Sequence, residues 1–380
     1  MLVSAQEVSS KPLVHQAYKY RIYPNTEQKQ LIRRMFGCCR FVFNYFLEAW
    51  NQRYVETGKG LSYHACATQL PGLKAQYDWL KEVDSIALQS AARHVADSFD
   101  RFFKKQNQAP RFKSRKHPIQ SYTTKFTNGN IAMEGSRLKL PKLGWIRFAN
   151  SRKLEGRILS ATVRKNASGK FFVSLVCEVQ KNPLPQVDTP IGIDLGLKEY
   201  AVCSNGEHIA NPRFYRQYEN KLALWQRRMA RRTPGGSNWK KARQHIARIH
   251  ERIANKRNDF LHKLTTRLIR ENQTISIEHL RVANMIQNPK LSKSIADASW
   301  GEWVRQLTYK AKWYGRNLRI ADTFEPTSQR CHVCGTIHPE VKNLSVREWT
   351  CTACGTIHDR DENAAHNIEK VAVNHHLTKR

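Results

Sequence analysis

The sequence predicts a multidomain α+β protein, with a β-barrel that carries inserted helices in its N-terminal half and an α/β domain that carries an inserted cysteine-rich module in its C-terminal half. Three observations support this prediction. The chain has 380 residues, whereas a single core usually stops growing at about 250–300 residues. Residues 25–103 have helical periodicity, but residues 130–179 alternate as short strands do. The proline-containing segment 181–185 predicts a boundary between the halves.

The N-terminal half begins with a strand and continues with helices. Residues 18–23 alternate basic with aromatic or apolar side chains, and Pro24 ends this strand. Thr26 is a candidate N-cap, and apolar residues then recur at helical spacing, with Gly37 as a break, which predicts two helices or one bent helix. Residues 65–103 predict three shorter helices.

Short strands follow. The turn residues Ser168 and Gly169 predict a hairpin. If the strand at 18–23 joins these strands, the helices are an insertion into a small β-barrel. The predicted strands are 130–133, 137–140, 145–148, 158–165 and 170–179.

The C-terminal half opens with three predicted antiparallel strands. Asn205 and Gly206 predict a type I′ turn between the second and third. Two long helices follow, then a buried strand, a helix, a strand, the cysteine-rich module and a final helix. The predicted ranges are 191–194, 199–203, 207–209, 215–232, 238–271, 274–278, 300–314 and 318–321.

The charge predicts a polyanionic partner. Lys and Arg number 64 and Asp and Glu 31, which gives a formal charge of +33. No run reaches the roughly 18 apolar residues of a membrane span, so nucleic acid is favoured over a membrane. The N-terminus lacks the apolar segment of a secretory signal, which predicts a cytoplasmic, nucleoid-associated protein.

Two segments concentrate this charge. Residues 101–133 hold eight Lys or Arg and no acid, with Phe112, Tyr122 and Phe126 interleaved, which favours nucleic-acid binding over a solvated loop. Arg111 and Lys113 are the candidate contacts there. Residues 221–257 hold twelve Lys or Arg against one acid, so the predicted helical hairpin should lie against phosphates.

Four of the nine cysteines form two Cys-x2-Cys pairs, each followed by glycine. The pairs are separated by sixteen residues, a spacing typical of a structural Zn²⁺ site with four thiolate ligands: Cys331, Cys334, Cys351 and Cys354. Four free thiols, a [2Fe–2S] cluster, or replacement of a ligand by one of three nearby histidines (His332, His338 and His358) are the alternatives.

Three carboxylates predict a catalytic site. Asp194 and Glu278 each end an apolar strand, and Asp361 opens the last helix, with Asp359 as its competitor. Each has an ordinary explanation by itself. Along the chain, an acid at the end of a strand is followed by a hairpin and helices, then by a second acid at the end of a strand, and finally by an acid at the start of a helix. This is the order of an RNase H-like fold. Carboxylate oxygens suit Mg²⁺, and two ions can activate water and stabilise a leaving oxygen.

These motifs resemble those of one family. Residues 192–196, 277–280, the paired cysteines and 359–368 are similar to the RuvC-I, RuvC-II, zinc-ribbon and RuvC-III segments of TnpB proteins. Residues 20–24 and 40–44 are similar to the opening of that family. The resemblance covers nearly the whole chain.

The resemblance implies a transposon-encoded nuclease related to type V CRISPR effectors. It implies a guide RNA from the transposon end, a double-stranded DNA target cut beside a short motif, and a monomeric ribonucleoprotein. It also implies a wedge-like β-barrel (1–50 and 104–185), a helical recognition lobe (51–103), a RuvC-like nuclease domain (186–325 and 358–380) and a zinc ribbon (326–357). By position, the implied nucleic-acid contacts are Tyr54, Ser85, Gln89 and Thr123, and Gln89 could pair with adenine.

Three other functions compete. A nuclease-inactive, RNA-guided repressor should have lost an acid, but all three stand in this sequence. A strand-transfer transposase uses an acidic triad on the same fold, but its third acid normally lies well inside a helix, without a zinc ribbon before it. A plain zinc-ribbon binding protein would leave the strand-end acids unexplained.

Overall fold

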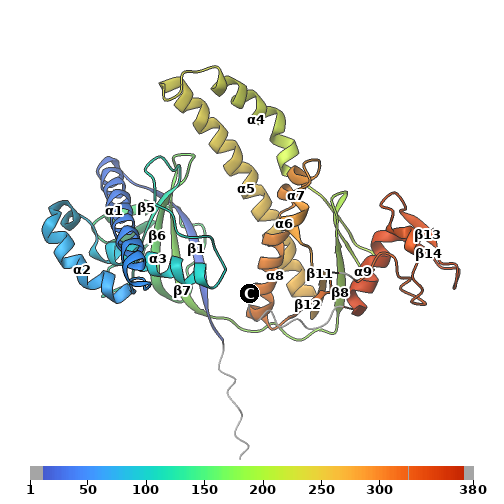
Figure 1. Cartoon of the computed structure of the whole chain (residues 1–380). Helices are drawn as coiled ribbons and strands as arrows, with labels where there is room; N and C mark the ends of the chain where they lie inside the picture. The colour runs from blue at the N-terminus through green and yellow to red at the C-terminus, as the bar shows by residue number, and fades with distance from the viewer. Residues whose placement is uncertain (1–11, 324, 372–380) are drawn as a thin grey trace, which may run out of the picture. The chain divides into compact units, whose positions relative to one another are not determined.

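The computed structural model describes residues 12–323 and 325–371, and the chain divides into two compact units at Gln180 (Figure 1). The division falls next to the predicted linker 181–185. Two predicted segments lie outside the described residues. One is the N-terminal segment that was predicted to lack a secretory signal, which is also the first eleven residues of the predicted barrel, and the other is the last nine residues of the predicted nuclease domain. No helix in the described ranges is long and apolar enough to cross a bilayer.

A seven-stranded antiparallel sheet forms the frame of the N-terminal unit, in the order β2-β6-β7-β1-β5-β4-β3. The strand expected at 18–23 is longer, at 13–23, and it does join the later strands, so the condition for a helical insertion is met. Among the described strands, β2 and β3 at the two ends of this order do not pair with each other, so closure into a barrel stays a prediction. The strands are β1 (Leu13–Tyr23), β2 (Gln120–Lys125), β3 (Ala132–Glu134), β4 (Arg137–Leu140), β5 (Gly144–Phe148), β6 (Arg157–Lys165) and β7 (Phe171–Gln180).

Strand β7 is an interior strand of this sheet, between β6 and β1, and its side chains alternate in burial. Val173, Leu175 and Cys177 are buried, and the residues between them are half-buried. Strand side chains alternate between faces, so one face packs on the core. Strand β2 lies inside the basic segment and was missed, because Gln120–Lys125 is mostly polar. Its Tyr122 is buried, which corrects the interpretation of this ring as a nucleic-acid contact.

Helices cover the sheet of this unit, and two expectations about them were wrong. Asn25, not Thr26, caps the first helix, because the Asn25 and Gln28 side chains form a reciprocal capping box. Gly37 does not break the helix, because buried residues on both sides of it continue one apolar stripe. The border predicted at residue 50 therefore falls within a helix. The helical elements are α1 (Thr26–Thr57), α2 (Tyr63–Gln76), the 3₁₀ turn Asp78–Glu82 and α3 (Ser85–Phe103).

The C-terminal unit has a five-stranded sheet in the order β10-β9-β8-β11-β12. The first three strands are antiparallel, whereas β11 runs parallel to both β8 and β12. This mixed order is that of the predicted RNase H-like fold. The strands are β8 (Pro190–Leu195), β9 (Glu199–Cys203), β10 (His208–Ala210), β11 (Thr274–Glu278) and β12 (Asn317–Ala321).

The turn between β9 and β10 differs from the predicted type I′ turn. Gly206 has a φ of 81°, but Asn205 does not have a positive φ, which a type I′ turn requires. The Cys203 amide donates to the Glu207 carbonyl at 2.9 Å, which encloses a three-residue loop. The loop is therefore a longer hairpin connection, with glycine at the left-handed position.

Helices lie on both faces of the C-terminal sheet. Ile191 and Ile193 of β8 pack in a core with Leu264 and Trp303, from the helices on one face. The last helix, α9, packs on the other face, against β8 (Figure 1). The helices are α4 (Phe214–Ala230), α5 (Ser237–Glu271), α6 (Val282–Met285), α7 (Ser292–Ala298), α8 (Trp300–Tyr314) and α9 (Arg360–Val371).

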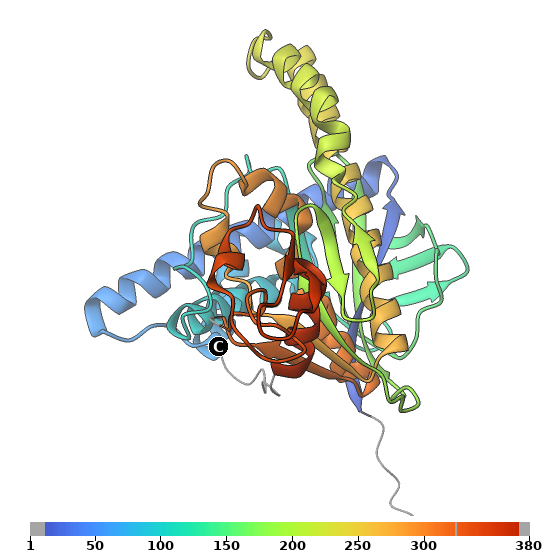
Figure 2. The same cartoon turned by 90° about the vertical axis from the view of Figure 1, so that its right-hand side faces the viewer.

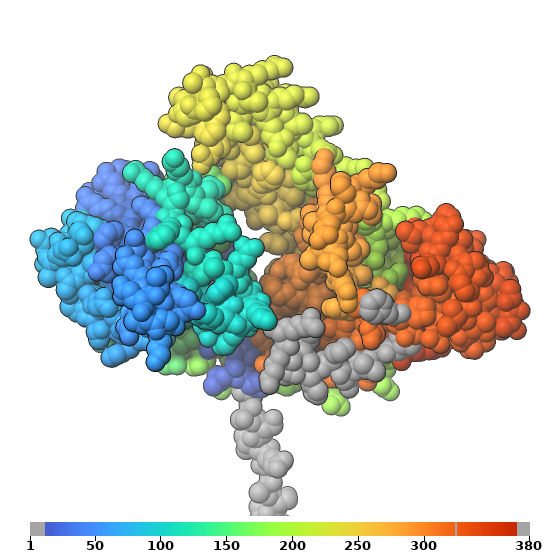
Figure 3. All heavy atoms as spheres, viewed as in Figure 1, coloured from blue at the N-terminus to red at the C-terminus, as the bar shows by residue number. Residues whose placement is uncertain are grey.

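Helices α4 and α5 form the predicted basic hairpin, whose tip extends well beyond the sheet (Figures 2 and 3). A small core of Leu222, Ile249 and Ile253 joins the two helices. Partly buried aromatic side chains pack around this core, and most other side chains of the hairpin are exposed or half-buried, available to solvent or to a partner. Its contact with phosphates stays a prediction.

Candidate active site and zinc ribbon

Asp194 and Glu278 end neighbouring parallel strands. Ile193 of β8 is paired with Ile277 of β11, so each carboxylate is the next residue after a matched pair. Because the carboxyl ends of parallel strands meet at one edge of a sheet, the two acids lie at the same edge. The Thr327 hydroxyl donates to Glu278 Oε1 at 2.7 Å and holds that side chain.

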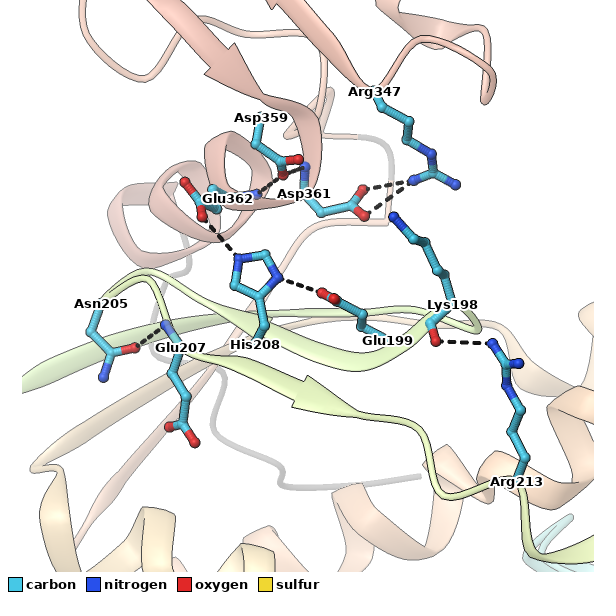
Figure 4. A network of polar contacts seen from close by, with 10 residues as sticks. All are labelled: Lys198, Glu199, Asn205, Glu207, His208, Arg213, Arg347, Asp359, Asp361 and Glu362. Atoms are coloured by element: carbon cyan, nitrogen blue, oxygen red, sulfur yellow. Dashed lines mark hydrogen bonds and ion pairs between the residues drawn. The ribbon is translucent and has the colours of Figure 1, made fainter. Parts of the chain in front are cut away.

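Asp361 comes to this edge in the first turn of α9. Asp359 Oδ1 accepts from the amides of Asp361 and Glu362, at 2.8 and 3.0 Å (Figure 4). Asp359 thus acts as the helix cap, and this leaves the Asp361 carboxylate to face Arg347. Arg347 Nη1 lies 3.2 and 3.1 Å from the two oxygens of Asp361. Nothing in the sequence pattern singled out Arg347.

Gly192 allows α9 to approach β8 closely. A Cβ at this position would lie 2.0 Å from the Ala365 carbonyl oxygen. Residues 192 and 194 face the same side of the strand, and residues 361 and 365 lie one helical turn apart. The contact of Gly192 with Ala365 therefore sets how near Asp361 comes to Asp194.

The electrostatics show that the three acids interact. Burial raises the pKa of Asp194 well above its usual range, and the charges of Glu278 and Asp361 raise it further. The Arg360 guanidinium acts in the opposite direction but does not offset the other effects. Carboxylates crowded in this way are stabilised by a bound cation, and hard oxygen donors suit Mg²⁺.

A second network ties α9 to the β9–β10 hairpin. One imidazole nitrogen of His208 bonds to Glu199 and the other lies 2.9 Å from Glu362 (Figure 4). Bonds to two carboxylates favour the protonated ring, so they raise the pKa of His208. The Ser204 hydroxyl makes a further link by donating to Glu369.

The four predicted zinc ligands converge. Their sulfur atoms all lie within 4.8 Å of one another, close enough for one tetrahedral ion. The Cys331 and Cys351 amides donate to the Thr336 and Thr356 carbonyls, at 2.8 and 2.9 Å. The two knuckles are thus built alike, and a four-sulfur set with no open position fits a structural zinc ion. The module also contains the short strands β13 (Glu348–Thr350) and β14 (Ile357–Asp359) and the 3₁₀ turn Pro339–Lys342.

Two of the three histidines near the cysteines have a role that the sequence reasoning missed. His358 Nε2 lies 3.1 Å from the Cys331 sulfur, and His338 Nε2 lies 3.3 Å from the Cys351 sulfur. Both rings are buried. Each knuckle therefore supplies a histidine that contacts a cysteine of the other. The repeated sequence Cys-Gly-Thr-Ile-His, at 334–338 and 354–358, is the signal that could have revealed this exchange.

The ribbon is connected directly to the acidic site. Asn363 Oδ1 accepts from the His332 amide at 2.9 Å, and the Asn367 amide group donates to the Thr327 carbonyl at 2.8 Å. These two buried asparagines, one turn apart on α9, hold the segment that leads into the first knuckle. Thr327 on this segment contacts Glu278, and Arg347, between the knuckles, contacts Asp361.

The predicted nucleic-acid contacts all lie in the N-terminal unit. Ser85 and Gln89 are exposed one turn apart on α3, and exposed Tyr54 stacks on Trp50 of α1. The Thr123 hydroxyl bonds across strands to Thr162 at 2.9 Å. None of these placements tests a nucleic-acid contact.

The two basic candidates lie on the segment before β2. Arg111 is exposed, with Nη2 at 3.3 Å from Gln108 Oε1. The Lys113 ammonium lies 3.7 Å from the centre of the Phe43 ring, and burial of that group lowers the pKa of Lys113. Asn44 fixes the segment through bonds to both the amide and the carbonyl of Lys113, at 2.8 and 3.0 Å.

The strand order and the acidic edge are those expected of a nuclease with an RNase H-like fold. Comparison with known proteins gives the family of this chain. A family described as "Probable transposase" (OrfB_IS605) matches residues 174–289, a "Cas12f1-like, TNB domain" matches 300–368, and a "Helix-turn-helix domain" matches 14–59. In the structure, this last range is one strand followed by one long helix.

Two relatives match over nearly their whole length. A Streptomyces pristinaespiralis protein named "Putative RNA-guided DNA endonuclease" is 41% identical and aligns with 93% of this chain and 89% of its own. A protein of Escherichia coli K12, "Putative RNA-guided DNA endonuclease InsQ", is 34% identical over 93% of this chain and 91% of its own. The chain belongs to the TnpB family, as its motifs predicted.

A solved structure shares the fold. A cryo-EM structure of Cas12f1 in complex with sgRNA and target DNA has a TM-score of 0.62 and 14% identity, and it covers 94% of this chain and 99% of that one. The mixed α/β architecture predicted from the sequence is thus confirmed at the level of a Cas12f-like fold.

Proposed function

We propose that the protein is an RNA-guided endonuclease that cuts double-stranded DNA next to a short transposon-associated motif. The observation that carries this proposal is the interaction of Asp194 with Glu278 and Asp361 at one edge of the RNase H-like sheet. The names of the two relatives, the Cas12f1 likeness and the charge of +33 all agree with it.

Asp194, Glu278 and Asp361 would hold two Mg²⁺ ions, which supply Lewis acidity and a more acidic bound water for phosphodiester hydrolysis. The remaining groups position these ligands. Thr327 orients Glu278, Asp359 caps α9, and Gly192 lets Asp361 approach. Arg347 pairs with Asp361 beside the half-buried Asp194 and would lie beside the phosphate under attack.

The other parts of the chain have roles consistent with this reaction. Cys331, Cys334, Cys351 and Cys354 would bind a structural Zn²⁺. The N-terminal unit would act as the wedge and recognition lobe, with Tyr54, Ser85, Gln89, Thr123, Arg111 and Lys113 as its contacts to nucleic acid. The working form would be a monomeric complex with guide RNA in the prokaryotic cytoplasm. The domain borders given above, except the one at residue 50 that falls within α1, are part of this proposal.

Two other functions fit the structure less well. A strand-transfer transposase should carry its third acid well inside a helix, whereas Asp361 lies in the first turn of α9, just after the ribbon. A nuclease-inactive repressor would not need to keep three interacting carboxylates at the cost of partly burying Asp194.

Cleavage by the purified ribonucleoprotein tests the proposal. With Mg²⁺ and the RNA that co-purifies, the wild-type protein should cut a matched duplex, and Asp194→Asn should lower the rate by at least about 10³-fold while RNA binding is kept. Asp188→Asn, at an exposed position just before β8, is the matched control and should cut normally. If Asp194→Asn cuts the duplex as fast as the wild-type protein, the catalytic assignment is contradicted. If the co-purifying RNA holds no transposon-end sequence, guidance by such an RNA is contradicted.

A further inference from the structure

A cavity of about 450 Å³ opens in the C-terminal unit, beside the turn that follows β8, the strand that carries Asp194. This volume is within the range of about 300–1,000 Å³ for ligand sites, so it could hold a nucleotide rather than a single ion. Three segments form its walls: the β8–β9 turn, the start of α4 with the loop before it, and α7 with the loop before it.

The cavity is strongly basic. Its cations are Lys198, Arg213, Arg216, Lys290 and Lys293, all with exposed side chains. Within the part of the chain that the structure describes, Lys198, Arg216 and Lys290 form no ion pair with a carboxylate. Uncompensated cations gathered in a concave site attract a polyanion.

The two acids in the wall are already engaged. Glu219 lies 3.3 Å from Lys293, and Asp297 Oδ2 accepts from the Tyr215 amide at 2.8 Å, at the start of α4. Asp297 also lies 3.7 Å from Arg257, and among the described residues neither acid forms an ion pair with the other four cations of the cavity. The positive charge of the cavity is thus left for a ligand.

Arg213 is held in place in spite of backbone strain. Its φ is 47°, a left-handed conformation that is costly for a side chain other than glycine. The Asn211 side chain accepts from the Arg213 amide at 3.2 Å and donates to the Leu197 carbonyl at 3.0 Å. Arg213 Nη2 in turn donates to the Lys198 carbonyl at 3.1 Å. These bonds fix the guanidinium against the turn that follows Asp194.

The cavity is adjacent to the acidic site. Lys198 follows Asp194 by four residues, so their Cα atoms can be at most about 14 Å apart. Figure 4 shows the Lys198 side chain directed toward Asp361 and Arg347, while its carbonyl faces Arg213. Lys198 therefore lies between the cavity and the carboxylates, a few nucleotides at most from the reacting bond.

We infer that this cavity binds the backbone phosphates of the DNA strand that enters the acidic site, and so sets which bond lies over Asp194. Acidic peptides or small anions would also be attracted by the charge, but neither would need a site next to the nuclease carboxylates. This inference rests on the proposed nuclease function, and it adds a strand-positioning site outside the carboxylates.

Paired double variants test the inference. Arg216→Ala with Lys290→Ala removes one Arg and one Lys from the cavity. Arg270→Ala with Lys312→Ala removes the same charges from positions of the same unit outside the cavity. The probe is a labelled oligodeoxythymidylate of about twelve nucleotides, added to the RNA-loaded protein. Fluorescence anisotropy over a range of salt concentrations measures its Kd, which does not depend on cutting.

The cavity variant should raise the Kd about 10-fold and reduce the slope of log Kd against log salt by about 1.4, since each phosphate contact on a single strand contributes about 0.7. Cleavage of the matched duplex should slow to a similar extent, and the main cut should spread to neighbouring bonds. The control variant should change each quantity by less than about twofold, and both should keep the wild-type Tm and RNA content.

Equal effects of the two double variants on the Kd and salt slope would overturn the inference, because charge alone would then account for binding. Loss of co-purifying RNA in the cavity variant would also overturn it, because the site would then hold guide RNA rather than DNA. If the cavity variant weakens probe binding but the wild-type protein cuts no duplex, the proposed function fails while the binding site stands.

Discussion

Replacing Gly192 with alanine should disable cutting by moving a helix rather than by removing a catalytic group. The new Cβ would lie 2.0 Å from the Ala365 carbonyl oxygen and 2.7 Å from the Glu369 amide nitrogen, and real Cβ contacts are essentially never under 3.0 Å. Both contacts are to α9 backbone, so the helix must retreat by about 1 Å. A displacement of this size at a reacting centre costs roughly 10²-fold in rate.

The stability cost of this change should be moderate. Overpacking a core contact typically costs about 1–3 kcal/mol, so Gly192→Ala should lower Tm by several degrees and still fold. Gly301→Ala, in the first turn of α8, is the matched control, because its new methyl group would have no atom of the described residues within 4 Å beyond its own chain neighbours and helix backbone. Single-turnover cleavage by folded protein is the assay. If Gly192→Ala cuts within about threefold of wild type, the spacing of α9 and β8 does not control the carboxylates.

Three further predictions concern the neighbouring contacts. Thr327→Val keeps the shape of the side chain but removes the hydroxyl that holds Glu278, so the Mg²⁺ concentration for half-maximal cutting should rise about 10-fold; an unchanged value would contradict this role. His358→Ala should weaken zinc binding about 10–100-fold in a chelator competition, and affinity equal to wild type would show that its contact with Cys331 is incidental. Folding raises the pKa of His208, so its bonds to the two carboxylates stabilise the folded state below pH ~6.5. This contribution to the free energy of unfolding, about 0.5 kcal/mol for a partly exposed pair, is lost as the pH rises through the pKa of the folded state. Tm measurements should show that His208→Gln costs more at pH 6 than at pH 9, and a constant difference would refute the linkage.

The sequence predicted the C-terminal unit well because its signals are local and strong. Apolar strands that end in Asp194 and Glu278 can be recognised without knowing their partners, and strand order follows from the spacing of the elements. The choice of Asp361 as the inward acid stays a prediction, although Asp359 is indeed occupied as a helix cap. The four cysteines converge as their spacing required.

The errors have a different origin. The type I′ turn at Asn205 and the break at Gly37 were inferred from local preferences, which packing over longer distances can override. Strand β2 was missed because a polar segment gives no alternation to detect. Thr327 and Arg347 could not be identified at all. Their roles depend on which carboxylate each faces after the chain folds, and no spacing in the sequence encodes that proximity.

The contacts of the zinc ribbon explain why it directly precedes α9. Thr327, before the first knuckle, holds Glu278, and Arg347, between the knuckles, holds Asp361. Asn363 and Asn367 fasten the same segment to the helix that carries Asp361. The ribbon has only a small core of its own, built around Val341 and Trp349, so a metal ion would supply much of its stability. Two of the three carboxylates that we propose to be catalytic are therefore positioned by this module. If the module binds zinc as proposed, loss of the ion should disturb the acidic site as well as the ribbon.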